Sequence, residues 1–106
     1  MDANCIFCKI VVKQIPASVV YEDEKTLAFL DINPLTEGHT LVIPKAHTVS
    51  IFDISADDFK HISAVAQKIS NNMKTAIAAD GVDLVQASGE AANQTVPHFH
   101  LHVIPR

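Results

Sequence analysis

Three of the six histidines in this chain alternate with apolar residues in the segment 97–106. They are His98, His100 and His102. As a β-strand, the segment would place all three imidazoles on one face and its apolar side chains on the other, because strand side chains alternate with a period of two. Imidazoles change charge near neutral pH, and the burial of apolar residues gives no reason for three of them. The pattern therefore predicts a chemically active surface.

The first chemistry that this surface suggests is nucleophilic catalysis. A neutral imidazole attacks phosphorus or acyl carbon when its second nitrogen is held as N–H by a carbonyl or carboxylate. A neighbouring histidine on the same face can hydrogen-bond the transferred group. Gln94 and Thr95, just before the segment, can add neutral donors to its anionic oxygens. Because His-x-His on a strand also chelates metals, a metallohydrolase site is an alternative interpretation.

Cys5 and Cys8 form a second group of reactive side chains near the start of the sequence. The segment 1–4 lacks the features of a signal peptide, so this pair indicates metal binding or redox activity rather than a structural disulfide. Two thiolates do not complete a tetrahedral zinc site, but His47 and His98 can supply the missing ligands. The alternative is that both cysteines are small buried residues of a turn.

Asp31 is a candidate residue for binding a ribose. It ends a predicted strand beside the loop 32–38, where a carboxylate can accept hydrogen bonds from ribose hydroxyls, as acidic residues do in dinucleotide-binding folds. An Asx-type turn at the strand exit explains the same residue at least as well.

Composition sets limits on the partners. The hydrophobic fraction of 48% is enough for one compact core, and the length predicts a single domain over residues 1–106. The formal net charge is −4 and the eight Lys and Arg residues are scattered, so we expect no nucleic-acid partner. Because no stretch approaches the roughly 18 apolar residues that span a bilayer, we expect no membrane partner and a cytoplasmic location. A few histidines and backbone amides can still hold a small anionic ligand.

Hydrophobic periodicity predicts the elements that position these residues. A short helix or turn is expected within residues 5–13, and strands are expected at 19–22, 25–31, 39–43, 82–87 and 97–106. With one long helix between the third and fourth strands, this order predicts an α+β domain with a five-stranded, mainly antiparallel sheet.

The long helix has a clear start and an apolar stripe. Ser55 and Asp58 resemble a capping box, and Gly81 is expected to end the helix in the left-handed conformation. The stripe consists of Phe59, Ile62, Ala66, Ile69, Met73 and Ile77. It should cover the apolar face of the segment 97–106, which leaves the histidine face free for a ligand. His61 lies off the stripe and is expected to be solvated.

The histidine pattern matches a family signature. Residues 98–104 have the His-φ-His-φ-His-φ-φ pattern, where φ is apolar, of the histidine triad (HIT) family. The segments 5–10, 29–34 and 39–47 resemble the Hint branch of that family in the same order, so the resemblance covers essentially the whole chain. It implies a five-stranded antiparallel sheet with one short and one long helix, and a homodimer in which the sheet continues across the two protomers.

Members of the Hint branch act on purine nucleoside phosphoramidates and related nucleotidyl substrates such as aminoacyl-adenylates. The resemblance therefore implies a nucleotide hydrolase whose ligand is a purine nucleotide such as AMP or GMP. By this resemblance, His100 attacks the α-phosphate and forms a nucleotidyl-histidine intermediate that water hydrolyses. His102 contacts the phosphate or the leaving group, and His39 supports the nucleophile from the neighbouring strand.

The resemblance also assigns the binding residues. Gln94 and Thr95 match a pair that binds the transferred phosphate and the leaving group, and Asp31 matches the acceptor of the ribose hydroxyls. Three residues match the apolar surroundings of the base: Phe7, Ile10 and Ile32. Zinc-bearing relatives hold a structural zinc ion with residues that correspond to Cys5, Cys8, His47 and His98.

The chain departs from the Hint pattern in three places. Many relatives have Asn at the position of Ala87 and Gly at the position of Asn93. The sequence stops at Arg106, whereas longer relatives have a C-terminal tail that reaches the partner's active site and influences leaving-group selectivity. Ala87 and the missing tail support an alternative function, a nucleotide-binding or partner-binding regulatory module whose hydrolysis is weak or vestigial.

Overall fold

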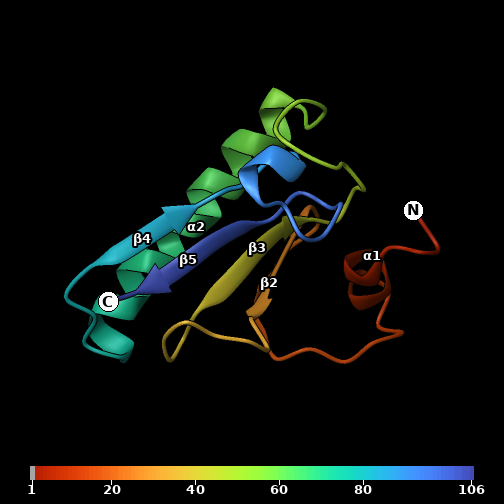
Figure 1. The fold of residues 1–106 in the computed structure, drawn as a ribbon. Helices are drawn as coiled ribbons and strands as arrows, with labels where there is room; N and C mark the ends of the chain where they lie inside the picture. The colour runs from red at the N-terminus through yellow and green to blue at the C-terminus, as the bar shows by residue number, and fades with distance from the viewer. Residues whose placement is uncertain (1) are drawn as a thin grey trace.

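The computed structural model describes residues 2–106, which form a five-stranded antiparallel sheet with two α-helices (Figure 1). The elements are α1 (Ile6–Val11), β1 (Val19–Glu22), β2 (Thr26–Leu30), β3 (Thr40–Pro44), α2 (Ala56–Ala76), β4 (Val82–Val85), a short 3-10 helix (Glu90–Ala92) and β5 (Leu101–Pro105). The strand order is β1-β2-β3-β5-β4, and each neighbouring pair is antiparallel. The predicted α+β fold is confirmed. Within residues 2–106, neither helix is long and apolar enough to cross a membrane.

The last strand is shorter than the sequence pattern predicts. β5 begins at Leu101, so His98 and His100 precede it, and the prediction of three histidines within one strand is wrong. The ladder with β3 starts where Leu101 faces Val42. Pro44, at the end of β3, has no N–H for a further ladder bond. Its carbonyl oxygen instead accepts a hydrogen bond from the His98 ring (2.8 Å).

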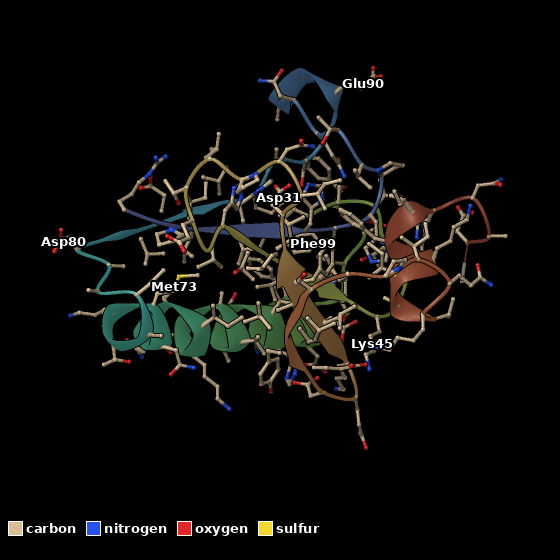
Figure 2. The ribbon with its side chains drawn as sticks, turned by 90° about the horizontal axis from the view of Figure 1, so that it is seen from below. Asp31, Lys45, Met73, Asp80, Glu90 and Phe99 are labelled. Carbon is tan, nitrogen blue, oxygen red and sulfur yellow. The ribbon has the colours of Figure 1, made fainter. Side chains whose placement is uncertain are left out.

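α2 packs against one face of the sheet, as its apolar stripe predicts. The Ser55 side chain accepts a hydrogen bond from the Asp58 N–H (3.0 Å) and caps the first turn. The buried residues of the helix are Ile62, Val65, Ala66, Ile69 and Met73, and they share one cluster with Phe99, Leu101 and Val103. Figure 2 shows Met73 on the side of α2 that faces the sheet. The two ends of the predicted stripe are more open, because Phe59 is 38% and Ile77 is 44% exposed.

The end of α2 differs from the prediction. The helix ends at Ala76, and the left-handed backbone conformation belongs to Ala78 (φ 53°) rather than to Gly81. The Ala79 N–H reaches back to the Met73 carbonyl oxygen (3.1 Å) and closes the last turn. Glycine is the usual residue at such a position, but here it is an alanine. The prediction that Gly81 ends the helix in the left-handed conformation is therefore wrong.

α1 covers part of the opposite face of the sheet. Its buried residues pack with alternate residues of β2 and β3 in a second apolar cluster: Cys5, Phe7, Cys8, Ile10, Leu27, Phe29, Leu41 and Ile43. Three histidines on this side are also buried, because His39, His98 and His100 are only 3%, 0% and 4% exposed. The expectation that the histidine face stays free holds only in part, because this face has an apolar core of its own beside the cavity described below.

His61 is not simply a solvated helix residue, as its position off the stripe suggested. Its Nε2 lies 2.8 Å from the Asp23 carboxylate in the turn between β1 and β2, and the Tyr21 hydroxyl donates to the same oxygen (2.8 Å). The carboxylate also accepts the N–H groups of Lys25 and Thr26 (both 2.9 Å). Partial burial raises the pKa of Asp23, but these hydrogen bonds together outweigh it and lower the pKa to about 2. The contact ties the β1–β2 turn to α2.

Candidate active site and metal centre

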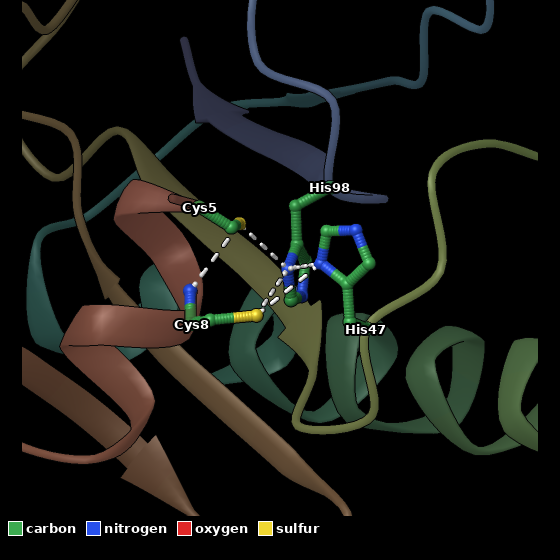
Figure 3. Close-up of side chains that lie close together, drawn as sticks. All are labelled: Cys5, Cys8, His47 and His98. Carbon is green, nitrogen blue, oxygen red and sulfur yellow. Dashed lines mark hydrogen bonds between the residues drawn. The ribbon is translucent and has the colours of Figure 1, made fainter. Parts of the chain in front are cut away.

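Four cysteine and histidine side chains meet beside α1 (Figure 3). They are Cys5, Cys8, His47 and His98, and their donor atoms all lie within 4.8 Å of one another. Cys5 Sγ lies 3.3 Å from His98 Nδ1, and Cys8 Sγ lies 3.2 Å from His47 Nδ1 and 3.6 Å from His98 Nδ1. The two Nδ1 atoms are 3.2 Å apart. The fold therefore brings the CxxC pair to the two histidines that the sequence predicted as its partners.

These distances fit a zinc ion. A tetrahedral ion with Zn–N bonds of about 2.0 Å and Zn–S bonds of about 2.3 Å separates neighbouring donor atoms by about 3.3 to 3.8 Å. The four separations given above run from 3.2 to 3.6 Å. Burial raises the pKa of the Cys5 thiol, and a bound cation offsets this effect by stabilising the thiolate. Four protein ligands complete the tetrahedron, which is the donor set of a structural zinc site.

A hydrogen bond and a nearby carboxylate outside the cluster orient its two histidines. His98 Nε2 donates to the Pro44 carbonyl oxygen (2.8 Å), which leaves Nδ1 as the metal-binding nitrogen. Burial lowers the pKa of His98, so the ring stays in its neutral, ligating form. His47 Nε2 lies 3.8 Å from the Asp2 carboxylate, which favours the same orientation of that ring with Nδ1 toward the cluster.

His100 is held by the backbone of one of these zinc-binding residues. Its Nδ1 lies 2.7 Å from the His98 carbonyl oxygen, and a carbonyl can only accept, so Nδ1 carries the proton. The lone pair of the neutral ring is therefore at Nε2. The ring packs edge-on against Phe7, with 5.3 Å between the ring centroids. A fixed N–H on one nitrogen and a free lone pair on the other are what a nucleophilic imidazole needs.

His39 sets the orientation of His102. The Leu35 N–H donates to His39 Nδ1 (3.1 Å), so a neutral His39 carries its proton on Nε2. That nitrogen lies 2.9 Å from His102 Nδ1 and donates to it, which places the proton of His102 on Nε2. Burial, and then the neighbouring imidazoles of His100 and His39, lower the pKa of His102. The expected support from His39 thus reaches His102 directly, and His102 lies beside His100 with 5.1 Å between ring centroids.

Asp31 lies at the edge of this group. Its Oδ1 accepts the Asn33 N–H (2.9 Å), which is the Asx-type turn considered as the alternative, and its Oδ2 lies 3.6 Å from His39 Nε2. Asp31, His39 and His102 place three possible metal-binding atoms within 4.8 Å. However, the Leu35 N–H puts the His39 proton on the nitrogen that would have to bind a metal. The hydrogen bonds therefore disfavour a catalytic metal at Asp31, His39 and His102, and with it the metallohydrolase interpretation.

A cavity of about 350 Å³ lies beside these histidines. Its walls include most of the predicted site, namely Phe7, Ile10, Asp31, Ile32, Thr95, His100 and His102. They also include Ile6, Ile15, Pro16 and Ala17, which sequence analysis missed because nothing in their spacing separates them from core residues. The cavity combines apolar side chains, which suit a planar base, with imidazoles and a carboxylate, which suit a phosphate and a ribose.

Thr95 lines the cavity, whereas the amide of Gln94 is bonded to the loop backbone. The Gln94 amide nitrogen donates to the Val49 and Val96 carbonyl oxygens (2.6 and 3.0 Å). Its amide oxygen accepts the Gly89 N–H (2.7 Å). In this conformation Gln94 braces the loop that carries Thr95, rather than offering its amide to a phosphate.

The two substituted loop positions fit the local backbone. Asn93 adopts the left-handed conformation (φ 68°), which asparagine tolerates better than most other non-glycine residues. The backbone that a glycine favours is thus kept. Ala87 contributes its carbonyl oxygen to a hydrogen bond from the Gln86 side chain (3.1 Å).

Comparisons with known proteins identify relatives of this chain. The HIT domain model matches residues 12–106. A HIT family protein from Bacillus anthracis has 53% sequence identity and a TM-score of 0.95, over 100% of this chain and 75% of that chain. A zinc-bound histidine triad family protein from Mycobacterium smegmatis has 47% identity and a TM-score of 0.95, over 97% of this chain and 75% of that chain.

An enzyme is also among the relatives. Adenosine 5′-monophosphoramidase HNT1 of Saccharomyces cerevisiae is 39% identical over 106 residues, which are 100% of this chain and 65% of that protein. The family model covers most of the chain, and the solved relatives share its fold over essentially its whole length. The chain therefore belongs to the HIT domain family.

Proposed function

We propose that this chain is a hydrolase of nucleotidyl substrates that transfers a nucleoside monophosphate first to His100 and then to water. The substrate is a purine nucleoside phosphoramidate or a related adenylate, and the yeast relative is named for such an activity. The hydrogen bond from His100 to the His98 carbonyl carries the proposal. It leaves the lone pair of a neutral imidazole beside a cavity of about 350 Å³, within the size range of small-ligand sites.

The reaction proceeds in two steps. The Nε2 lone pair of His100 attacks the α-phosphorus, and the bond from phosphorus to the leaving nitrogen breaks. The amine leaves with the bonding electron pair and takes a proton from solvent, while the Nε2–H of His102 donates a hydrogen bond to a phosphoryl oxygen. Water then attacks the phosphorus and loses its proton to solvent, which releases the nucleoside monophosphate and restores the His100 lone pair.

The other predicted residues bind the substrate in this proposal. The Oδ2 atom of Asp31 accepts a ribose hydroxyl, and the Thr95 hydroxyl donates to a phosphate oxygen. Apolar side chains, including Ile10 and Ile32, surround the base. The zinc ion supplies structure through its four protein ligands and takes part in neither step.

The direct test is turnover of an adenosine phosphoramidate by wild-type protein and by His100→Ala. Turnover should fall by at least about a thousandfold, because the variant lacks the nucleophile. His61→Ala is the matched control, since it removes an imidazole from α2, outside the cavity, and should keep full turnover. A nucleotidyl adduct on His100, trapped by acid quench and identified by its mass, should appear in the wild type. Near-full turnover by His100→Ala would refute covalent catalysis by this residue.

One observation favours a second function, a nucleotide-binding module with vestigial hydrolysis. The Gln94 amide is engaged by the backbone at both of its ends, so one predicted phosphate donor is withdrawn from the ligand. In that case the chain would bind AMP tightly while turning over phosphoramidates, adenylates and dinucleoside polyphosphates negligibly. Calorimetric titration with AMP and a turnover assay on the same preparation separate the two functions.

The homodimer implied by the family resemblance is also part of the proposal. Both edge strands of the sheet, β1 and β4, offer unpaired backbone groups to a second copy. The register of the β1 edge shifts between Val19 and Tyr21, and such irregularities hinder edge-to-edge pairing. Both edges carry two half-exposed apolar residues, Val19 (47%) and Val20 (46%) on β1 and Leu84 (55%) and Val85 (45%) on β4, but β4 has the regular register. We therefore assign the dimer contact to β4.

A further inference from the structure

Helix α1 connects the metal centre to the nucleophile. Cys5 caps the helix and Cys8 lies within it, and Phe7 stands between these two zinc-binding residues. The Phe7 ring packs edge-on against His98, with 5.8 Å between centroids, and against His100, with 5.3 Å. One aromatic side chain thus contacts both a metal-binding imidazole and the catalytic imidazole. Phe7 is 7% exposed, so it has little freedom to move while α1 stays in place.

A second connection runs through the backbone of His98. This residue is held by its ring in the metal cluster, by Nε2 at the Pro44 carbonyl (2.8 Å), and by its N–H at the Val96 carbonyl (2.8 Å). Its own carbonyl oxygen then accepts the proton of His100 Nδ1 (2.7 Å). Any movement of residue 98 therefore moves the group that selects the reactive tautomer of His100.

α1 is too short to hold these positions by itself. A helix of six residues is marginal in water, and its place depends on tertiary contacts. Here those contacts are the buried side chains of Phe7, Cys8 and Ile10 and the two zinc-binding thiols. Loss of the metal would remove the attachment on both sides of Phe7 and would leave the Pro44 carbonyl as the remaining hydrogen-bond partner of the His98 ring.

We infer that the metal centre fixes the orientation and the tautomer of His100, and that Phe7 is the positioning residue that transmits this effect. The inference rests on the proposed function of His100 as nucleophile. It differs from the role that the family resemblance implies for Phe7, which is to surround the base. A residue that only contacts the base changes the affinity for the nucleotide, whereas a residue that positions the nucleophile changes the rate of the chemical step.

The first experiment compares Phe7→Leu with Phe59→Leu. Phe7→Leu keeps all four metal-binding side chains but removes the ring from His100. Phe59→Leu makes the same change on α2, where the ring contacts Phe99 with 6.0 Å between centroids. Phe7→Leu should lower kcat for an adenosine phosphoramidate by about tenfold or more, with KM changed by less than about threefold and one zinc per chain retained. Phe59→Leu should leave both constants close to wild type.

The second experiment reads the tautomer of His100 without turnover. Long-range ¹H–¹⁵N spectra of the zinc-loaded wild type should show His100 as a single Nδ1–H tautomer. Removal of zinc with a chelator, at a temperature where the backbone amide spectrum still shows a folded protein, should replace that signal by tautomer exchange or line broadening. Zinc-loaded Phe7→Leu should show a milder change of the same kind, and zinc-loaded Phe59→Leu should show none.

Three outcomes would overturn the inference. One is a Phe7→Leu protein with raised KM and unchanged kcat, which would restrict Phe7 to the base. Another is an equal loss of activity in both leucine variants. The third is an unchanged His100 tautomer in folded, zinc-free protein. Failure of the proposed function would look different, because His100→Ala would then keep its turnover whatever the spectra of the wild type show.

Discussion

At the scale of single residues, backbone groups assign different tasks to histidines that look equivalent in the sequence. The Pro44 carbonyl directs Nδ1 of His98 to the metal, and the His98 carbonyl directs the lone pair of His100 to the cavity. The Leu35 N–H acts through His39 and turns His102 into a donor at Nε2. Each hydrogen bond selects one tautomer, and in the proposed mechanism the tautomer decides whether a ring binds the metal, attacks the phosphorus or donates a hydrogen bond.

The orientation of His102 leads to a prediction for His39→Ala. Burial lowers the pKa of His102, and the neighbouring imidazoles of His100 and His39 lower it further. Removing His39 takes away one of these neighbouring imidazoles, admits water and deletes the donor to His102 Nδ1, and each change favours the protonated form of His102. The pKa of His102 should therefore rise in the variant, toward the reference value of about 6.5. Turnover should fall by about ten- to a hundredfold, because the ring is no longer oriented.

NMR titration of the His102 ring protons measures this pKa, and His61→Ala is the control that should leave it unchanged. A wild-type His102 that titrates above the usual histidine range would contradict the prediction, as would a lower pKa in His39→Ala.

At the scale of elements, the contact between the β1–β2 turn and α2 should contribute to stability in a pH-dependent way. The pKa of Asp23 in the folded protein is about 2, below its usual value of 3.8. Its contribution is therefore complete above about pH 4 and is lost as the pH falls through 2. Asp23→Asn should lower the free energy of unfolding by about 1 kcal/mol near neutral pH, since the carboxylate is partly exposed and the hydrogen bonds are partly replaced by water.

Urea unfolding at a series of pH values between neutral and about 2.5 checks this prediction. The difference between Asp23→Asn and wild type should shrink toward the acid end. A difference that is constant across the series would show that the ionised carboxylate is not the source of the stability.

Two substitutions after the end of α2 test how backbone conformation there affects stability. Ala78 has a left-handed conformation that glycine adopts without steric cost, so Ala78→Gly should stabilise the protein by about 1 kcal/mol. A Cβ added at Gly81 meets nothing within 4 Å, and its φ is not in the left-handed region, so Gly81→Ala should be neutral or slightly stabilising. Thermal unfolding of the two variants compares them directly. Destabilisation by Ala78→Gly would show that the loss of backbone freedom outweighs the relief of strain.

At the scale of the whole molecule, the proposed dimer should depend on β4. Leu84→Glu places a charge where two β4 edges would meet, so it should shift a dimeric wild type toward monomer at micromolar concentration. Val19→Glu on β1 is the matched control, because this residue is similarly exposed (47%) on the other edge. Sedimentation velocity measures the proportion of monomer and dimer in both variants. Dissociation by Val19→Glu alone would move the contact to the β1 edge.

Local patterns determine much of this protein before any tertiary structure is known. Periodicity places α2 and its buried stripe, because residues such as Ile62 and Ile69 fall on one helical face wherever the helix packs. The His-φ-His-φ-His-φ-φ segment indicates the family, which the HIT domain model confirms, and the CxxC pair indicates a metal site, although each motif alone leaves an alternative open. The resemblance also proposes the partners of Cys5 and Cys8, and the structure brings them together.

Tertiary structure determines the hydrogen bonds between residues that are far apart in the sequence. The alternating histidines predict one uniform strand, but Pro44 ends the ladder, so His98 and His100 receive their hydrogen bonds outside it. The backbone bonds of Gln94 and the position of His39 against His102 rather than His100 likewise follow from packing between separate segments. Sequence spacing determines which side chains can do chemistry, whereas the tautomer and direction of each one depend on backbone groups that only the folded chain brings within reach.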